Sequence, residues 1–265
     1  MFSKLELALK YIHYYLTASN GKGHGIHSPF IFQFITEILN DKTQYPAYDV
    51  VEDLRRKLLK DQTILTINDL GAGSAVDKTH QRTIASIVSH AVKQKKFGQV
   101  LFRMVKKYQP QTILELGTSL GVTTAYFSLA NPAATIFTFE GAKSVAEKAK
   151  DNFNSLALQN IRLVQGNFNE TLGATISSLP SVDLAFIDGN HRKEPTINYF
   201  MAILPKTNNF SVLILDDIHW SEEMEEAWNY CKEHQAVTLS IDLFFMGILF
   251  FRKEVREKQH FHIRF

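Results

Sequence analysis

The chain has little of several features that would assign it to a specialised class of protein. Its 265 residues include one cysteine, Cys231, so no disulfide can form within the chain and a reducing compartment is expected. No apolar run approaches the ~20 residues of a membrane span. The N-terminal stretch lacks the continuous apolar core and small-residue cleavage site of a signal peptide. We therefore expect a soluble, cytoplasmic protein with no membrane partner.

An excess of one charge is also absent. Lys and Arg number 29 against 27 Asp and Glu, which leaves a formal net charge of +2. The densest basic cluster, Lys93, Lys95 and Lys96, fits a solvated helix end. Nucleic acid is therefore not expected as a partner. The hydrophobic content of 45%, with 20 Phe and 9 Tyr, is enough for a globular core or an aromatic pocket.

The sequence pattern of residues 1–95 indicates helices joined by loops. A first helix is predicted from an apolar stripe at helical spacing, and Ser28 and Pro29 resemble the N-cap and first position of a second helix. A third helix is predicted over 51–60 and a fourth around 84–91. The stripe of the first helix comprises Leu5, Ala8, Leu9, Ile12 and Leu16. We interpret residues 1–95 as a helical extension that covers a pocket formed by the remainder of the chain.

From residue 96 to 265, helical patterns alternate with short apolar strands, which predicts a parallel sheet with helices on its faces. The predicted strands are 112–116, 135–140, 161–165, 182–187 and 212–216. Segments 237–240 and 244–251 are too close together for a helical crossover, so they should pair antiparallel. The expected fold is α/β, a Rossmann-like doubly wound parallel sheet ending in an antiparallel hairpin. The tail 261–265 alternates like an edge strand that could pair in a homodimer.

The most informative motif is the stretch Thr112-Ile-Leu-Glu-Leu-Gly-Thr-Ser-Leu-Gly121. A strand ends near Glu115, and the chain then turns through Gly117 and Gly121 into a helix whose free N–H groups can meet a ligand. The spacing E-x-G-x-x-x-G differs from the dinucleotide pattern G-x-G-x-x-G, and the acid would repel a diphosphate. It suits a ligand with an ammonium group, such as S-adenosylmethionine. We predict that Glu115, Gly117, Thr118, Ser119 and Gly121 bind this cofactor.

Ligands of open α/β sheets bind beyond the carboxyl ends of the strands. Glu140 ends the second strand, where a carboxylate can accept two hydrogen bonds from a ribose diol. Gly166 permits close approach of an adenine, and Asn167 could recognise the edge of that base. Phe168 could pack on the base or belong to the core. Acids also favour turns and helix N-termini, so capping is the competing interpretation at each of these positions.

The segment 97–220 resembles the metal-dependent O-methyltransferase families related to the catechol and caffeoyl-CoA enzymes. FGQVLFRMV before TILELGTSLGVTTAYFSLA is similar to their entry helix and cofactor loop, and VDLAFIDGNH and VLILDDIHW are similar to their metal-binding strand ends. The DGNH and DDIHW forms are closer to a group that includes macrolide-sugar O-methyltransferases. The resemblance implies a class I S-adenosylmethionine-dependent methyltransferase. LPKTNNFSVLIL lacks the usual glycine pair, and residues 1–95 have no counterpart.

The resemblance also implies a set of metal ligands. Asp188, Asp216 and Asp217 would hold Mg²⁺, with Asp188 also close to the cofactor, and oxygen ligands are those that Mg²⁺ prefers. The competing interpretation is that one acid points outward and the other caps the next helix. His191 and His219 follow these acids, and a neutral imidazole there could accept the proton of a substrate hydroxyl.

The predicted function is S-adenosylmethionine-dependent methylation of oxygen on a small hydroxylated molecule, assisted by Mg²⁺. One alternative is a metal-independent methyltransferase acting on nitrogen, a carboxylate or RNA. Another is a non-catalytic protein that binds S-adenosylmethionine, and a nicotinamide oxidoreductase is the least favoured. The glycine-rich turn Asn68–Ser74 is interpreted as a structural or substrate-side loop rather than a second cofactor site.

Overall fold

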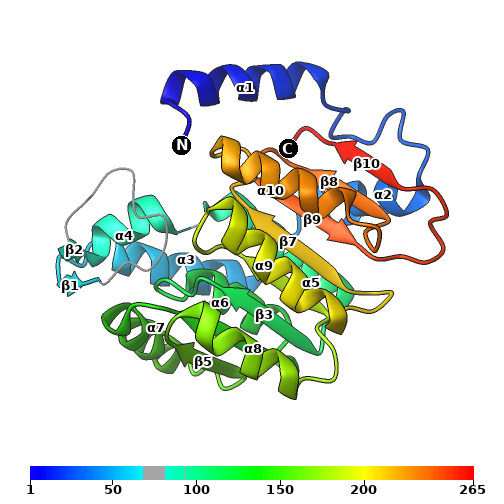
Figure 1. The fold of residues 1–265 in the computed structure, drawn as a ribbon. Coiled ribbons are helices and arrows are strands. Elements are labelled where there is room, and N and C mark those ends of the chain that lie inside the picture. The colour runs from blue at the N-terminus through cyan, green and yellow to red at the C-terminus, as the bar shows by residue number, and fades with distance from the viewer. Residues whose placement is uncertain (68–80, 93) are drawn as a thin grey trace. The chain divides into compact units, whose positions relative to one another are not determined.

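The computed structural model describes residues 1–67, 81–92 and 94–265 (Figure 1). The chain divides into two compact units: unit 1 consists of Met1–Lys42 with Ser181–Phe265, and unit 2 is Thr43–Pro180. The predicted division into residues 1–95 and 96–265 stays a prediction. The predicted turn Asn68–Ser74 lies outside the described residues.

Unit 2 contains a three-stranded parallel layer in the order β3-β4-β5. A short antiparallel pair, β1 with β2, stands apart from this layer. The elements are α3 (Pro46–Leu58), β1 (Ile64–Thr66), β2 (Gln81–Thr83), α4 (Ile84–Ala91), α5 (Lys95–Tyr108), β3 (Thr112–Leu116), α6 (Val122–Ala130), β4 (Thr135–Glu140), α7 (Lys143–Ser155), β5 (Ile161–Gln165) and α8 (Phe168–Ser178). The bounds predicted for β3, β4 and β5 are confirmed.

An aromatic cluster explains why residues 43–58 belong with this layer. Tyr48 of α3 contacts Phe102 of α5 and Tyr126 of α6, with ring centroids 5.1 and 6.1 Å away. The Tyr126 hydroxyl also donates a 2.7 Å hydrogen bond to Glu52 of α3. Helix α3 starts at Pro46, five residues before the predicted start, because proline suits the first helical position.

Unit 1 contains the antiparallel hairpin. Its strand order is β10-β8-β9-β7-β6, in which β6 and β7 are parallel and β9 is antiparallel to both β7 and β8. The elements are α1 (Lys4–Thr17), α2 (Pro29–Phe34), the π-helix η1 (Ile35–Leu39), β6 (Leu184–Ile187), α9 (Lys193–Ile203), the 3₁₀-helix η2 (Leu204–Lys206), β7 (Val212–Asp216), α10 (Glu222–Glu233), β8 (Leu239–Asp242), β9 (Met246–Phe250) and β10 (Gln259–His262). The predicted hairpin is confirmed, and the tail adds β10 as an edge strand parallel to β8.

Helix α1 begins with a capping box between Ser3 and Glu6 and lies beside α10 and the C-terminal strand (Figure 1). Its inner face packs Leu7, Tyr11 and Tyr14 against Phe244 and Phe245. The predicted stripe of Leu5, Leu9, Ile12 and Leu16 is on the opposite, exposed face. Across the described part of the chain, no helix is long and apolar enough to cross a membrane.

Candidate functional site

The bend after β3 has a backbone that glycine makes feasible. Gly117 and Gly121 have φ values of 109° and 78°, and Ser119 between them has a φ of 48°. The N–H groups of Gly117 and Thr118 both donate to the Phe139 carbonyl on β4, at 3.0 Å. The bend is thereby fixed to the end of the neighbouring strand before α6 begins at Val122.

Glu115 lies beneath this bend with a fully buried side chain. Its Oε2 accepts hydrogen bonds of 2.5 Å from Thr124 on α6 and 2.6 Å from Thr138 on β4. Thr138 is the register partner of Glu115 in the parallel pair. Among the described residues, no hydrogen-bond partner reaches the buried Oε1. One carboxylate oxygen is thus held in place while the other has unused acceptor capacity.

The protonation of Glu115 depends on this burial. Burial raises the pKa of Glu115 to about 8, against the opposing hydrogen bonds from Thr124 and Thr138, and the nearby Glu140 charge raises it further. A positive group brought to Oε1 would favour the ionised carboxylate. The pKa of Glu115 therefore links its charge state to the presence of a cationic ligand.

Glu140 ends β4 next to the bend. Its Oε2 accepts a 2.9 Å hydrogen bond from the Ser119 N–H, and its Oε1 accepts one of 2.9 Å from the Ala142 N–H. Both carboxylate oxygens are oriented by backbone amides. Each oxygen can accept more than one hydrogen bond, so a ribose diol remains compatible with this arrangement.

The third strand end adjoins Glu140. The Gly166 N–H donates to the Glu140 carbonyl at 2.9 Å, which places Gly166 beside that residue with a φ of 137°. Asn167 caps α8 by accepting a 3.0 Å hydrogen bond from the Asn169 N–H. The Phe168 ring meets Phe139 edge-on at 6.3 Å. The nine cofactor-binding residues predicted before Asp188 therefore lie at the carboxyl ends of three adjacent strands of unit 2.

In unit 1, Asp188 and His191 form a pair after β6. The His191 Nε2 is 3.5 Å from Asp188 Oδ1, and the His191 ring meets Trp220 edge-on at 5.5 Å. Asn190 and His191 both have positive φ values, 72° and 36°. This strained bend turns the imidazole back toward Asp188. The contact between His191 and Trp220 joins the loop after β6 to the loop after β7.

Asp216 and Asp217 follow β7 but have different surroundings. Asp216 is buried at the end of the strand, whereas Asp217 has a φ of 51° and its N–H donates to the Phe245 carbonyl at 2.8 Å. The described residues contain no group of three or more His, Cys, Asp or Glu that could hold a metal ion. The expected Mg²⁺ site at Asp188, Asp216 and Asp217 is therefore not shown and stays a prediction.

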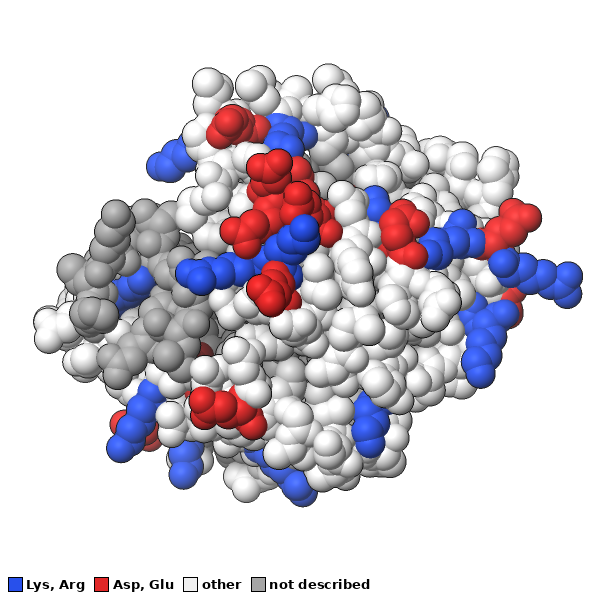
Figure 2. Space-filling model, viewed as in Figure 1, with Lys and Arg blue, Asp and Glu red and all other residues white. Residues whose placement is uncertain are grey.

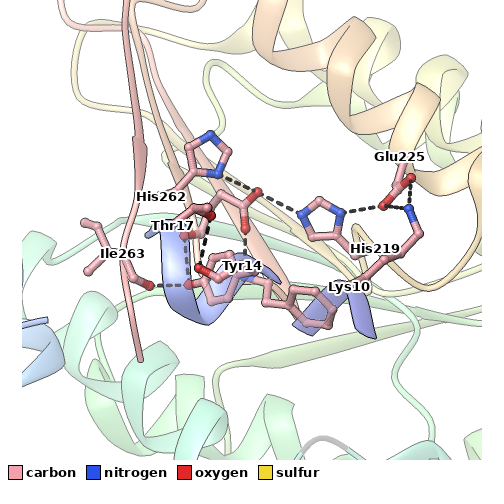
Figure 3. Close-up of polar contacts among 9 residues, drawn as sticks. Lys10, Tyr14, Thr17, His219, Glu225, His262 and Ile263 are labelled. Atoms are coloured by element: carbon pink, nitrogen blue, oxygen red, sulfur yellow. Dashed lines mark hydrogen bonds and ion pairs between the residues drawn. The ribbon is translucent and has the colours of Figure 1, made fainter. Parts of the chain in front are cut away.

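His219 belongs to a polar network that the sequence did not predict (Figure 3). Its Nδ1 is 2.9 Å from Glu225 Oε1 and its Nε2 is 2.8 Å from Asp242 Oδ2. Lys10 of α1 pairs with Glu225 at 2.9 Å, and His262 of β10 is 3.3 Å from Asp242. The His219 ring also stacks on Phe244 at 5.0 Å. Both ring nitrogens are therefore occupied by carboxylates.

Two pKa shifts describe this network. Burial lowers the pKa of His219, but the hydrogen bonds and charges of Asp242 and Glu225 outweigh it and raise the pKa overall. Burial alone would raise the pKa of Asp242, yet hydrogen bonds from His219, His262 and the Phe244 N–H leave it well below its usual range. The two acids favour the protonated form of His219, and both of its ring nitrogens are engaged, which suits positioning better than proton abstraction.

Acidic side chains gather over the start of α10 in Figure 2. The first turn of this helix carries Glu222, Glu223 and Glu225, and Lys193 pairs with Glu226 at 2.8 Å. Negative charge is favourable at a helix N-terminus. We interpret this patch as capping of α10 rather than as a ligand site.

Two threonines that the sequence analysis did not single out, Thr124 and Thr138, contact Glu115. Thr118 shares a 2.5 Å hydrogen bond with Thr138, which in turn contacts Glu115. A signal existed for Thr124, because it follows Gly121 in the first turn of a helix. Lys10 and Glu225 offered no such signal, since 215 positions separate them.

Residues 114–218 match a protein family described as "Methyltransferase domain". A tRNA (guanine-N(7)-)-methyltransferase of Mycoplasma mobile is 28% identical over 89 residues, which are 34% of this chain and 44% of that protein. The uncharacterized protein y4gI of Sinorhizobium fredii is 26% identical over 170 residues, 58% of this chain and 18% of that protein. The chain thus spans less than half the length of either curated relative.

Solved structures show the same fold. The SAH-bound methyltransferase PaMTH1 of Podospora anserina aligns with a TM-score of 0.57 and 11% identity, covering 96% of this chain and 98% of that one. The SAM-bound O-methyltransferase TomG of Streptomyces achromogenes aligns with a TM-score of 0.56 and 14% identity, covering 79% and 91%. The SAH-bound O-methyltransferase of Bacillus cereus gives 0.53 and 15%, covering 83% and 97%.

These findings define the class of protein. The fold is the Rossmann-like α/β fold of methyltransferases, with a mostly parallel sheet and flanking helices, and the predicted fold class is confirmed. The segment that contains the bend, Glu140 and Asp216 matches a methyltransferase domain. The expected resemblance to class I S-adenosylmethionine-dependent O-methyltransferases is likewise confirmed.

Proposed function

We propose that this protein is an S-adenosylmethionine-dependent methyltransferase that acts on a hydroxyl oxygen of a small molecule. The observation that carries the proposal is the Glu115 carboxylate, buried beneath the bend with Oε1 lacking a partner among the described residues. An ammonium group would satisfy that oxygen. The match of residues 114–218 to a methyltransferase domain supports the same cofactor independently.

Each predicted cofactor residue has a distinct task in this proposal. Glu115 would bind the amino group and Glu140 the ribose diol, while Gly117 and Gly121 allow the backbone to approach. Gly166 would leave room for the adenine beside Asn167 and Phe168. The cofactor, when bound, supplies an electrophilic methyl group, so the protein mainly has to align an acceptor. Such alignment contributes ~7–11 kcal/mol in well-oriented reactions.

His191 is the better candidate for accepting the proton of the acceptor hydroxyl. Asp188 lies 3.5 Å from its Nε2 and can orient the ring, as an acid does in other histidine bases. We assign His219 to positioning, because Glu225 and Asp242 engage both of its nitrogens. This assignment departs from the equal roles expected for the two histidines.

Magnesium assistance remains a prediction. Because the described residues contain no group of three or more His, Cys, Asp or Glu that could hold a metal ion, we derive no step through Mg²⁺. Methyl transfer measured after chelation, and again after Mg²⁺ is returned, decides the point. Loss of activity restored by Mg²⁺ would establish the metal, and unchanged activity would remove it.

RNA methylation is the second candidate, favoured by the likeness to a tRNA methyltransferase over 34% of the chain. The formal charge of +2 speaks against a large phosphate-binding surface. Incubation with S-adenosylmethionine labelled in the methyl group, and with total RNA or a panel of phenols and sugars, separates the candidates. Label in small hydroxylated molecules supports our proposal, whereas label in RNA alone refutes it. If no acceptor is labelled while the cofactor binds, a non-catalytic binder is favoured.

The same proposal includes a cytoplasmic location, expected from the single cysteine, which is buried and free. Fractionation of cells from the source organism tests the location directly. Recovery with cytosolic markers is expected, and recovery with membranes contradicts it.

A further inference from the structure

Helix α1 presents an apolar stripe to solvent on the face away from unit 1. Leu5, Leu9, Ile12 and Leu16 are 71%, 58%, 53% and 71% exposed. Their spacing of four, three and four residues is that of the a and d positions of a coiled coil. The inner face is already occupied, because Tyr14 packs on Phe244 with centroids 5.3 Å apart. The helix is therefore apolar on two opposite sides, and only one side is covered within unit 1.

We propose that α1 is a self-association surface, on which the α1 helix of a second copy of this chain packs antiparallel. In that register Leu5 lies opposite Leu16 of the second copy, and Leu9 lies opposite Ile12. The twofold axis passes between residues 10 and 11, so the same contacts occur twice, as an isologous interface requires. The inference concerns association alone and does not depend on the proposed methyl transfer.

The residues that flank the stripe favour a second copy of α1 as the partner and antiparallel packing of the two helices. Helical spacing places Glu6 and His13 on one edge of the stripe and Ala8 and Tyr15 on the other. Antiparallel pairing sets Glu6 against His13 of the second copy, which combines an acid with a base, and sets the small Ala8 against the large Tyr15. Parallel pairing would instead set Glu6 near Ala8 and His13 near Tyr15. Antiparallel helix dipoles also attract one another.

The composition of the edges also argues against a lipid surface as the occupant. Membrane-surface helices carry Lys and Arg along the polar face. Here one edge carries Glu6. The helix has two lysines: Lys4 is at its first position, and Lys10 on the inner side is already paired with Glu225 at 2.9 Å.

The size of the face fits a reversible dimer. A helix of 14 residues is ~21 Å long. Burial of the stripe on both copies would remove on the order of 1,000 Å² from solvent, near the lower bound of a specific interface. We therefore expect a dimer that dissociates on dilution rather than an obligate one.

Sedimentation velocity of the full chain from about 1 to 100 μM measures the association. Wild type should show a reversible monomer–dimer equilibrium. The double variant Leu9→Gln/Ile12→Gln should raise the dissociation constant by at least ~100-fold. The matched control Phe210→Gln removes a side chain that is equally exposed, at 71%, but lies outside α1, and it should leave the equilibrium unchanged. Circular dichroism verifies that each variant is folded.

Disulfide trapping tests the direction of the helices. Leu5→Cys and Leu16→Cys are made separately, against a background in which Cys231 is buried. Antiparallel packing predicts an intermolecular disulfide only when the two variants are mixed, whereas parallel packing would cross-link each variant with itself. The proposal is overturned if the wild type stays monomeric at about 100 μM, or if the Leu9→Gln/Ile12→Gln variant dimerises normally. Self-cross-linking of either cysteine variant also overturns it. So does sedimentation of the protein with phosphatidylcholine–phosphatidylserine vesicles, if that sedimentation requires the stripe.

Discussion

Replacement of Glu115 with Gln should change how stability depends on pH. Burial raises the pKa of Glu115 from its ordinary 4.5 to about 8. The native state therefore holds this proton more tightly than the unfolded chain between those two values. The stabilising contribution of the protonated group is fully present below pH 4.5 and is lost as the pH rises through 8. Glutamine keeps the shape but cannot ionise.

The magnitude follows from the pKa. Over 3.5 pH units at ~1.36 kcal/mol each, ionisation of Glu115 lowers the free energy of unfolding by up to about 5 kcal/mol. Without cofactor, Glu115→Gln should therefore gain stability relative to wild type as the pH is raised from 5 to 8. Urea unfolding at several pH values measures this difference, with exposed Glu170→Gln as the control. Parallel wild-type and Glu115→Gln curves would refute the assigned burial.

Binding of S-adenosylmethionine should also depend on the Glu115 proton, but binding should become tighter as the pH rises, whereas stability falls. If the ammonium group requires the ionised carboxylate, the dissociation constant for S-adenosylmethionine falls about tenfold for each pH unit that the pH is raised toward 8. Above pH 8 the dissociation constant levels off. Glu115→Gln should bind weakly at all pH values and lose this slope. Isothermal titration calorimetry in buffers of different ionisation heat also counts the released proton. A slope retained in the variant would contradict the role of Glu115.

Three further outcomes are expected. Glu140→Gln should weaken S-adenosylmethionine binding by ~10–100-fold in calorimetry, because it removes charge from two predicted hydrogen bonds; unchanged affinity contradicts the ribose contact. His191→Gln should lower kcat by ~10²–10⁴-fold with little change in cofactor affinity, and a normal rate would dismiss the proton-accepting role. Gly121→Ala should lower the melting temperature, because φ is 78° and the added Cβ would lie 2.3 Å from Phe153; an unchanged value would mean that the bend relaxes freely.

The parallel strands could be predicted from sequence because local signals define them. β3, β4, β5 and β7 are short apolar runs bounded by turn residues, and their bounds agree with the structure. The carboxyl ends of β3, β4 and β5 are neighbours, so Glu115, Glu140 and Gly166 lie together as expected. The hydrophobic periodicity of the sequence and the known topology of α/β sheets were sufficient to predict these strands and their neighbouring carboxyl ends.

Contacts between distant segments could not be predicted. The apolar stripe of α1 indicated a helix, but its periodicity does not say which face is covered, and Leu9 is exposed while Tyr14 is buried. The engagement of His219 by Asp242 and Glu225 depends on the hairpin and α10 packing together, which no local pattern encodes. The adjacent acids Asp216 and Asp217 share a motif but not an environment, because the left-handed backbone at Asp217 redirects the chain.

A crystal structure with S-adenosylhomocysteine tests the central assignment most directly. We predict that the amino group of this product lies within hydrogen-bond distance of Glu115 Oε1 and that its ribose hydroxyls meet Glu140. Soaks at saturating concentration that leave the bend empty, or density for the product elsewhere in the protein, would contradict the assignment.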